Sequence, residues 1–457
     1  MIAASQFKVL GGPTFAGPSN RVIFGSESKI FSPRFGFAWT PFGTKTVLRG
    51  GTGVFVFPVA NPSFNQNGFS QSTPMPVSTD NFVTAHATLA NPFPDGFLQP
   101  TGSSLGIATS LGQSFNYFNP TLQNPYSIRW EMGIQRELPG QLVLELAYIG
   151  NHAVHLPLNR NMDATPAQYL STLPFRDTAT INYLGTLVAN PFQGLIPANA
   201  TLNGAQVSRG TLLTPYPQFT GITLQATNAA SSYFHSMDVR IEKRYSHGLS
   251  MLANFTYSKL ISQDNYKNAT DLAPEKRVAG DDRPLRFVLS GSYELPFGKG
   301  KRFDTHSRIG NRIVGGWVLN SIYTNQIGAP LSFSSSIIFL GGPLNSNPHP
   351  SNLDQPMFTT TNFVTNSAQQ LGNNINTFGT RYGNVRQDGA ANVDLSMIKD
   401  TAITERVKLQ FRFEAFNAFN RPEFDAPNLT VTNAGFGKIT NQPNLPRGIQ
   451  MALRLAF

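Results

Sequence analysis

The sequence contains no cysteine and few charged residues for its length of 457 residues. The absence of cysteine excludes disulfide bonds, thiolate zinc sites and cysteine nucleophiles. Asp, Glu, Lys and Arg together make up 13% of the chain, about half of the roughly 25% usual in globular proteins. No run of about 18 apolar residues occurs, so the sequence predicts no transmembrane helix. Met1 leads directly into polar and Gly-rich sequence, so we expect no signal peptide in this chain.

A block of basic residues is also missing, although the net charge is +10. The Lys and Arg side chains are scattered singly, and the densest group is Lys299, Lys301 and Arg302. Nucleic-acid binding domains concentrate their basic residues in one patch. We therefore expect no nucleic-acid partner.

The clearest pattern that is present is strict alternation of apolar and polar residues. Leu142, Leu144, Leu146 and Tyr148 fall on one face, and Gln141, Glu145 and Ala147 fall on the other. Successive side chains of a strand point to opposite faces, so this pattern predicts a strand with one apolar and one polar face. The pattern recurs along the whole chain. The recurrences predict an all-β fold of about eleven long strands, at 34–40, 46–57, 126–137, 141–150, 235–245, 248–261, 284–297, 316–326, 390–400, 406–418 and 448–457.

The predicted connections between these strands alternate in length. Short or medium connections, such as 41–45 and 246–247, are followed by long ones. The long connections are 58–125, 151–234, 262–283, 327–389 and 419–447. Short turns at one end and long loops at the other are typical of an outer-membrane β-barrel, in which tilted strands of about ten residues cross the bilayer. The sequence therefore predicts a transmembrane antiparallel β-barrel of the outer-membrane type, in contact with lipid.

Aromatic residues fit this interpretation. Seven of them lie in or at the ends of predicted strands, where interface girdles of Trp and Tyr are expected. They are Trp39, Trp130, Trp317, Tyr148, Tyr257, Tyr293 and Tyr323. Bacterial outer-membrane barrels also commonly end in an aromatic residue that the barrel assembly machinery reads. The candidate C-terminal assembly signal here is Ile449, Met451, Leu453, Leu455 and Phe457.

Catalytic constellations are not evident, and we expect no enzyme activity, no cofactor and no metal site. The pair His152 and His155 has no nearby carboxylate and lies on an extended segment. Asp281 and Asp282 are adjacent residues at a strand entry, so we expect both carboxylates to be solvated.

Charged residues on the polar faces of the strands are the main candidate site. They are expected to face the barrel lumen, either as a ladder of cross-strand ion pairs or as contacts to a plug or a passing substrate. These residues are Glu145, Asp238, Arg240, Glu242, Arg244, Lys408, Arg412, Glu414 and Arg454.

The first long loop is nearly uncharged. Loop 58–125 contains Asp80, Asp95 and His86 among many Asn, Gln, Ser, Pro and Phe residues. Such a surface suits neutral ligands such as glycans or peptides, which aromatic stacking and amide hydrogen bonds recognise. The other interpretation is a rigid cover built by turn residues.

Eight stretches, in order along the chain, resemble the C-terminal barrel portion of Oar-like TonB-dependent receptors. They include SPRFGFAWTPFGTKTVLRGGTGVF at 32–55, DDRPLRFVLSGSYELPFGKGKR at 281–302 and LQFRFEAFNAFNRPEF at 409–424. The resemblance implies a TonB-dependent transporter of the Gram-negative outer membrane, with a barrel of about 22 strands. It also implies an N-terminal plug, a TonB-contacting segment and an N-terminal β-sandwich, and we expect none of these parts within this sequence.

On this basis residues 1–457 are expected to be a partial barrel domain, corresponding to about the last eleven strands. TonB would then be a partner only through the missing N-terminal part, and the substrate is not identified by any motif. Eleven strands of a larger barrel leave two unpaired edges in lipid. The chain is therefore part of a longer protein, or hidden strands in loops 58–125 and 151–234 close a smaller barrel, or the sheet curls and closes on itself. The alternative functions are a passive porin-like channel and a surface adhesion or structural protein.

Overall fold

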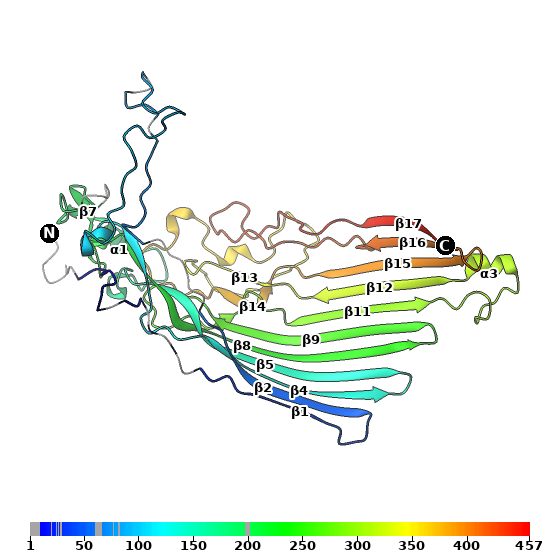
Figure 1. The fold of residues 1–457 in the computed structure, drawn as a ribbon. Coiled ribbons are helices and arrows are strands. Elements are labelled where there is room, and N and C mark those ends of the chain that lie inside the picture. Colours follow the sequence, from blue (N-terminus) through cyan, green and yellow to red (C-terminus); the bar gives the residue numbers. More distant parts are fainter. Residues whose placement is uncertain are drawn as a thin grey trace.

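The computed structural model describes residues 10–19, 21–23, 25, 27, 30–59, 66–75, 77–80, 83–196 and 202–457. Parts of the expected domain 1–457, and of loops 58–125 and 151–234, lie outside these residues. The main element is one large sheet in which eleven long strands follow each other in chain order, each antiparallel to the next (Figure 1). These strands are β1 (Arg34–Trp39), β2 (Thr46–Val56), β4 (Tyr126–Leu138), β5 (Leu142–Asn161), β8 (Gly221–Ser246), β9 (Leu249–Gln263), β11 (Leu285–Glu294), β12 (Trp317–Gln326), β15 (Ala391–Ala402), β16 (Lys408–Phe416) and β17 (Gly448–Ala456).

The predicted all-β class and the large antiparallel sheet are confirmed, and each predicted strand overlaps one observed strand. Two predicted lengths are wrong, since β5 and β8 contain 20 and 26 residues and pair with each other far beyond 150 and 235. Their outer parts carry register shifts after Ala153, Leu156 and Leu158. Each β-bulge adds an unpaired residue, which breaks the alternation by which the sequence reveals a strand.

The connections lie at the two ends of the sheet according to their length. In Figure 1 the short turns lie on the right, together with the C-terminus, and the long connections gather on the left. The turn between β8 and β9 is a two-residue loop, His247-Gly248, and both residues have positive φ (51° and 80°). This is the type I′ geometry that matches the right-handed twist of paired strands, and glycine adopts it without strain.

The strand register places the apolar residues on one face and the polar residues on the other. Directly paired residues share a face, and Leu146 pairs with Val239, which pairs with Phe255. Across β15, β16 and β17 the same face carries Met397, Phe413 and Met451. The same pairing puts all seven predicted girdle aromatics on this apolar face.

The two edge strands, β1 and β17, lie at opposite ends of the strand order and on opposite sides of the sheet in Figure 1. Every residue of both strands is exposed. Chain direction alternates from each strand to the next in this order. The first and the eleventh strands therefore run in the same direction. The described strands therefore end in two edges with the same chain direction.

Smaller elements decorate the long-loop end. The additional strands are β3 (Ser114–Phe118), which pairs parallel to β8, β10 (Arg277–Val278), which pairs with β9, β6 (Leu187–Ala189) with β7 (Gln206–Ser208), and β13 (Pro330–Ser332) with β14 (Arg381–Arg386). Within the described residues, none of them extends the strand order of the main sheet. The helical segments are η1 (Gly106–Ser110), η2 (Ala167–Tyr169), α1 (Thr178–Gly185), α2 (Arg209–Leu212), α3 (Arg308–Val314), η3 (Thr360–Asn362) and η4 (Ser367–Gln369).

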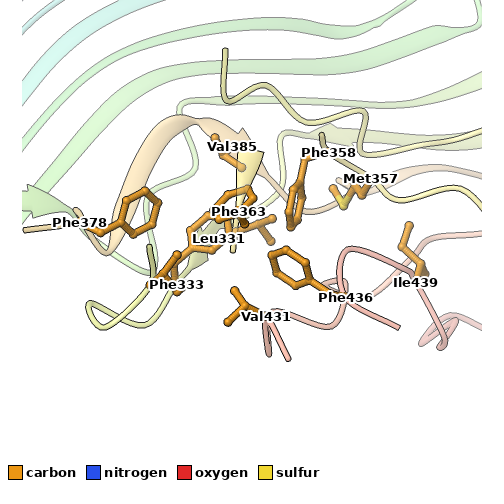
Figure 2. Close-up of a cluster of buried hydrophobic side chains, with 11 residues drawn as sticks. Leu331, Phe333, Met357, Phe358, Phe363, Phe378, Val385, Val431, Phe436 and Ile439 are labelled. Carbon is orange, nitrogen blue, oxygen red and sulfur yellow. The ribbon is translucent and has the colours of Figure 1, made fainter. Parts of the chain in front are cut away.

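The main apolar core lies outside the large sheet, in the long connections after β12 and β16. We call this unit the outer cap, residues 327–390 and 417–447. Phe363 lies at its centre and contacts the rings of Phe333, Phe358 and Phe436 (Figure 2). The remaining buried members of the cluster are Leu331, Ile337, Met357, Phe378, Val385, Val431 and Ile439.

No helix in the part of the chain that the structure describes has the length and apolar character needed to cross a membrane.

Candidate functional site

The predicted charged residues fall into two groups on the polar face of the sheet. Glu145, Asp238, Arg240, Glu242 and Arg244 lie on β5 and β8, which are neighbouring strands. Lys408, Arg412, Glu414 and Arg454 lie on β16 and β17, and four strands separate the two groups. The sequence thus predicted one set, but the sheet divides it.

The first group forms a network of mixed charge that we call the β5–β8 ladder. Arg240 pairs directly with Glu145 across the strands, with 3.7 Å between Nη1 and Oε2. Its Nη2 donates to Oε2 of Glu242 at 2.9 Å on its own strand. Arg244 lies 3.6 Å from Oε1 of Glu137, on β4. Asp238 accepts a hydrogen bond of 2.9 Å from the hydroxyl of Ser236.

A cavity of about 330 Å³ opens over this ladder. Its walls include Arg49 from β2 and Gln135 from β4 as well as the charged residues of β5 and β8. Small residues leave room for it, because Arg49 pairs opposite Gly133, and Gly133 pairs opposite Ala147. The cavity therefore presents three guanidinium groups and two carboxylates on one surface.

The second group is more open. Arg412 donates to Oε1 of Gln410 at 2.7 Å, and Gln410 donates to Oδ1 of Asp400 at 2.9 Å. Glu414 accepts a short hydrogen bond from Gln450 on the edge strand. Lys408 and Arg454 are exposed, and neither makes an ion pair with a described residue. This group is a row of polar side chains on the last two strands of the sheet.

The arrangement suits reversible contact with polar groups better than bond-breaking chemistry. The side chains of Arg240 and Glu145 are 47% and 34% exposed. Exposed ion pairs contribute only about 0–1 kcal/mol, so their partners exchange readily. The described residues contain no group of three or more His, Asp or Glu side chains placed to hold a metal ion. His152 lies within β5 and stacks on Tyr233, with 4.0 Å between the ring centroids.

A second set of charges, which the sequence analysis missed, lies between the sheet and the outer cap. The side chain of Asp282 is fully buried, so the expectation that it is solvated is wrong. Its carboxylate accepts a short hydrogen bond from Nη2 of Arg386 and a 2.6 Å bond from the backbone N–H of Leu260. Lys259 lies 3.5 Å away. A buried carboxylate persists only where charges and hydrogen bonds satisfy it, as they do here.

Asp388, like Asp282, is a buried carboxylate held by several partners, and it connects the two segments of the outer cap. Its carboxylate accepts hydrogen bonds of 3.1 Å from Arg421 and from the backbone N–H of Phe424. The ring Nδ1 of His349 lies 3.1 Å from the same group. These contacts join the connection after β12 to the connection after β16. Asp388 and Arg421 belong to segments without alternation, so the strand pattern of the sequence does not indicate this contact.

Asp264 ties the end of β9 to the cap region. Burial raises the pKa of this carboxyl, but hydrogen bonding to Arg277 and the charges of Arg277 and Arg381 outweigh that effect and hold it below its usual range. Arg277 Nη2 lies 2.8 Å from Oδ1 of Asp264, and Arg381 Nη1 lies 3.6 Å from Oδ2. Opposite charges favour the ionised carboxylate. The loops at this end are therefore held together by ionised side chains.

A match to a known protein family agrees with this architecture. The sequence pattern of a family described as "Outer membrane beta barrel domain" matches residues 3–450. Among solved structures, the outer-membrane transporter YddB from Escherichia coli is similar, with 12% identity and a TM-score of 0.39 over 93% of this chain and 40% of that one. The ferripyoverdine receptor of Pseudomonas aeruginosa has 12% identity and a TM-score of 0.39 over 94% and 33%.

The Ferric-Catecholate import receptor Fiu from Escherichia coli K12 has 8% identity and a TM-score of 0.37 over 93% of this chain and 34% of its own. The chain spans less than half the length of each of these three structures. No curated protein sequence matches it significantly.

Proposed function

Because this chain belongs to the outer membrane beta-barrel domain family, we propose that it is part of the barrel wall of a TonB-dependent, Oar-like receptor that takes up a substrate across the outer membrane. In this proposal residues 1–457 are a partial barrel domain. The remaining strands, the plug and the TonB-contacting segment belong to the rest of the protein.

The observation that carries the proposal is the pair of edges, β1 and β17. Both run in the same direction and both are exposed over their whole length. Bacterial single-chain barrels have an even number of antiparallel strands. Closing eleven strands without a parallel seam requires an odd number of further strands, and every unpaired backbone group left in lipid costs several kcal/mol. This supports a larger barrel over a barrel closed by the present strands alone.

The β5–β8 ladder supports a role for the polar face in transport. Arg240, with carboxylates on two sides, offers charged donors and acceptors that rearrange at little cost. Such a surface suits contact with a mobile plug or a polar substrate. The motifs shared with Oar-like receptors support the same assignment.

The size of the native protein tests the proposal. An antibody against residues 448–457 is used to blot the outer-membrane fraction of the host, with boiled and unboiled samples. We expect a heat-modifiable band well above 49.9 kDa and capture of the full-length protein by the periplasmic domain of TonB. A heat-modifiable band near 49.9 kDa with stable conductance in a planar bilayer would replace the receptor by a porin-like channel. Surface binding without uptake or conductance would favour an adhesin.

A further inference from the structure

A second cavity, of about 780 Å³, lies at the long-loop end, outside the β5–β8 ladder. Its lining includes the N-terminal segment 10–16, residues of β3, and Tyr216. The buried Gln218 holds the segment in place, because its Nε2 donates to the carbonyl oxygens of Leu10 and Gly11 at 2.8 and 3.2 Å. Gly12 packs so closely on Phe219 that a Cβ would lie 2.9 Å from the ring. The cavity is thus a built feature of the fold.

The described lining of the cavity is uncharged. None of the described residues that line it is Asp, Glu, Lys, Arg or His, although the whole chain has a net charge of +10. Burial raises the pKa of Tyr117, and the nearby Tyr216 raises it further, so this phenol stays neutral at physiological pH. A charged ligand would lose its hydration here without gaining a partner. The volume lies within the range of small-molecule sites, about 300–1,000 Å³.

Aromatic rings and unused polar atoms lie next to each other in the lining. Phe115 packs edge-on against Phe219 at 5.0 Å and lies 6.4 Å from the ring of Tyr117. The hydroxyls of Tyr117 and Tyr216 make no hydrogen bond to any described residue. Asn67 donates to Ser110 and to a backbone carbonyl, but within the described residues its own side-chain oxygen accepts nothing. An apolar ligand would bury these groups unpaired, at about 1–3 kcal/mol each.

We propose that this cavity binds a neutral saccharide, which the receptor takes up as substrate or part of a substrate. A pyranose ring has an apolar C–H face that stacks on aromatic rings and a rim of hydroxyls that pairs with the Tyr hydroxyls and Asn67. The assignment of the saccharide as transported cargo rests on the receptor function proposed above. The binding site itself does not.

The test uses outer-membrane vesicles that carry the full-length native protein. Titration calorimetry is performed with maltotriose, cellotriose, triacetylchitotriose and the uncharged peptide N-acetyl-trialanine amide. We expect at least one trisaccharide to bind and the peptide not to bind. Tyr117→Phe and Tyr216→Phe each remove one hydroxyl without changing ring packing, and each is expected to weaken binding about fivefold, the equivalent of one hydrogen bond.

Tyr183→Phe is the matched control, because Tyr183 lies on α1 outside the cavity, and we expect unchanged affinity. Binding of none of the sugars, peptide binding alone, or equal affinity in all variants would overturn the saccharide assignment. Sugar binding without TonB-dependent uptake would overturn the transport proposal and leave the site intact. Uptake of another compound without sugar binding would overturn the saccharide site and leave the proposed receptor function intact.

Discussion

The buried carboxylate of Asp282 and the guanidinium of Arg386 form an ion pair that joins the entry of β11 to β14 of the outer cap. The two residues are 104 positions apart in the sequence. Arg386 also donates to the carbonyl oxygens of Asp282 and Gly328, at 2.9 and 3.0 Å. The pair therefore fixes the position of the cap on the sheet.

Removing one member of this pair is expected to loosen the cap. Asp282→Asn leaves the Arg386 charge buried without its partner, which costs about 3–5 kcal/mol in comparable pairs. We expect the urea midpoint for tryptic cleavage within 327–390 to fall. Asp281→Asn is the control, because that neighbouring side chain is exposed and its loss should leave the midpoint unchanged. Equal midpoints for both variants would show that the pair does not hold the cap.

The two faces of β5 are expected to respond in opposite ways to the same substitution. Leu146 lies on the apolar face and Ala147 on the polar face. Leu146→Arg places a charge against lipid, at a cost of about 2–4 kcal/mol near the midplane. We expect less folded protein in the outer membrane, measured as the heat-modifiable fraction, whereas Ala147→Arg retains it. A larger loss for Ala147→Arg would reverse the assignment of the faces.

The sheet could be predicted from the sequence because each transmembrane strand repeats one physical rule, apolar on one side and polar on the other. That rule found the eleven strands of the main sheet, but it missed the outer part of β5, where bulges after Ala153 change the register. It also could not predict the contacts of Asp282 and Asp388. Their partners come from distant loops, and no local periodicity in the sequence indicates these contacts. Alternation places Arg240 and Glu145 on one face, whereas only the pairing of β5 with β8 brings them together.

The C-terminal residue is expected to matter for assembly more than for stability. The side chain of Phe457 is 97% exposed and lies beyond the end of β17. Ile449, Met451, Leu453 and Leu455 share the apolar face with β16. Deletion of Phe457 should slow the appearance of heat-modifiable protein in the outer membrane while the protein, once folded, keeps its unfolding temperature. Normal assembly kinetics would exclude an assembly signal at this residue.

The link between Asp264 and Arg277 should give the loop at 264–283 a pH-dependent stability. The pKa of Asp264 in the folded protein lies below its ordinary value of 3.8. Its contribution is therefore complete above about pH 4 and is lost as the pH falls through the folded pKa. Hydrogen exchange of this loop should accelerate on acidification below pH 4. Asp264→Asn should show fast exchange already at pH 7 and a weaker response to acid.

The aromatic core of the outer cap should unfold as its own unit. Phe363 contacts five other Phe rings, those of Phe333, Phe339, Phe358, Phe378 and Phe436. Phe363→Ala removes the central ring, and such a change costs about 3–5 kcal/mol because the cavity collapses only in part. Since the cap core and the strands of the large sheet are separate packing units, we expect faster hydrogen exchange in 327–390 and 417–447 and unchanged protection in β8 and β9.

Phe419→Ala is the control for this variant, because that side chain is 73% exposed and its removal should change exchange little. Accelerated exchange of β8 and β9 in Phe363→Ala would show that the cap and the sheet unfold together. In that case the Asp282–Arg386 pair would couple the two units strongly enough that loss of cap packing reaches the membrane-spanning strands.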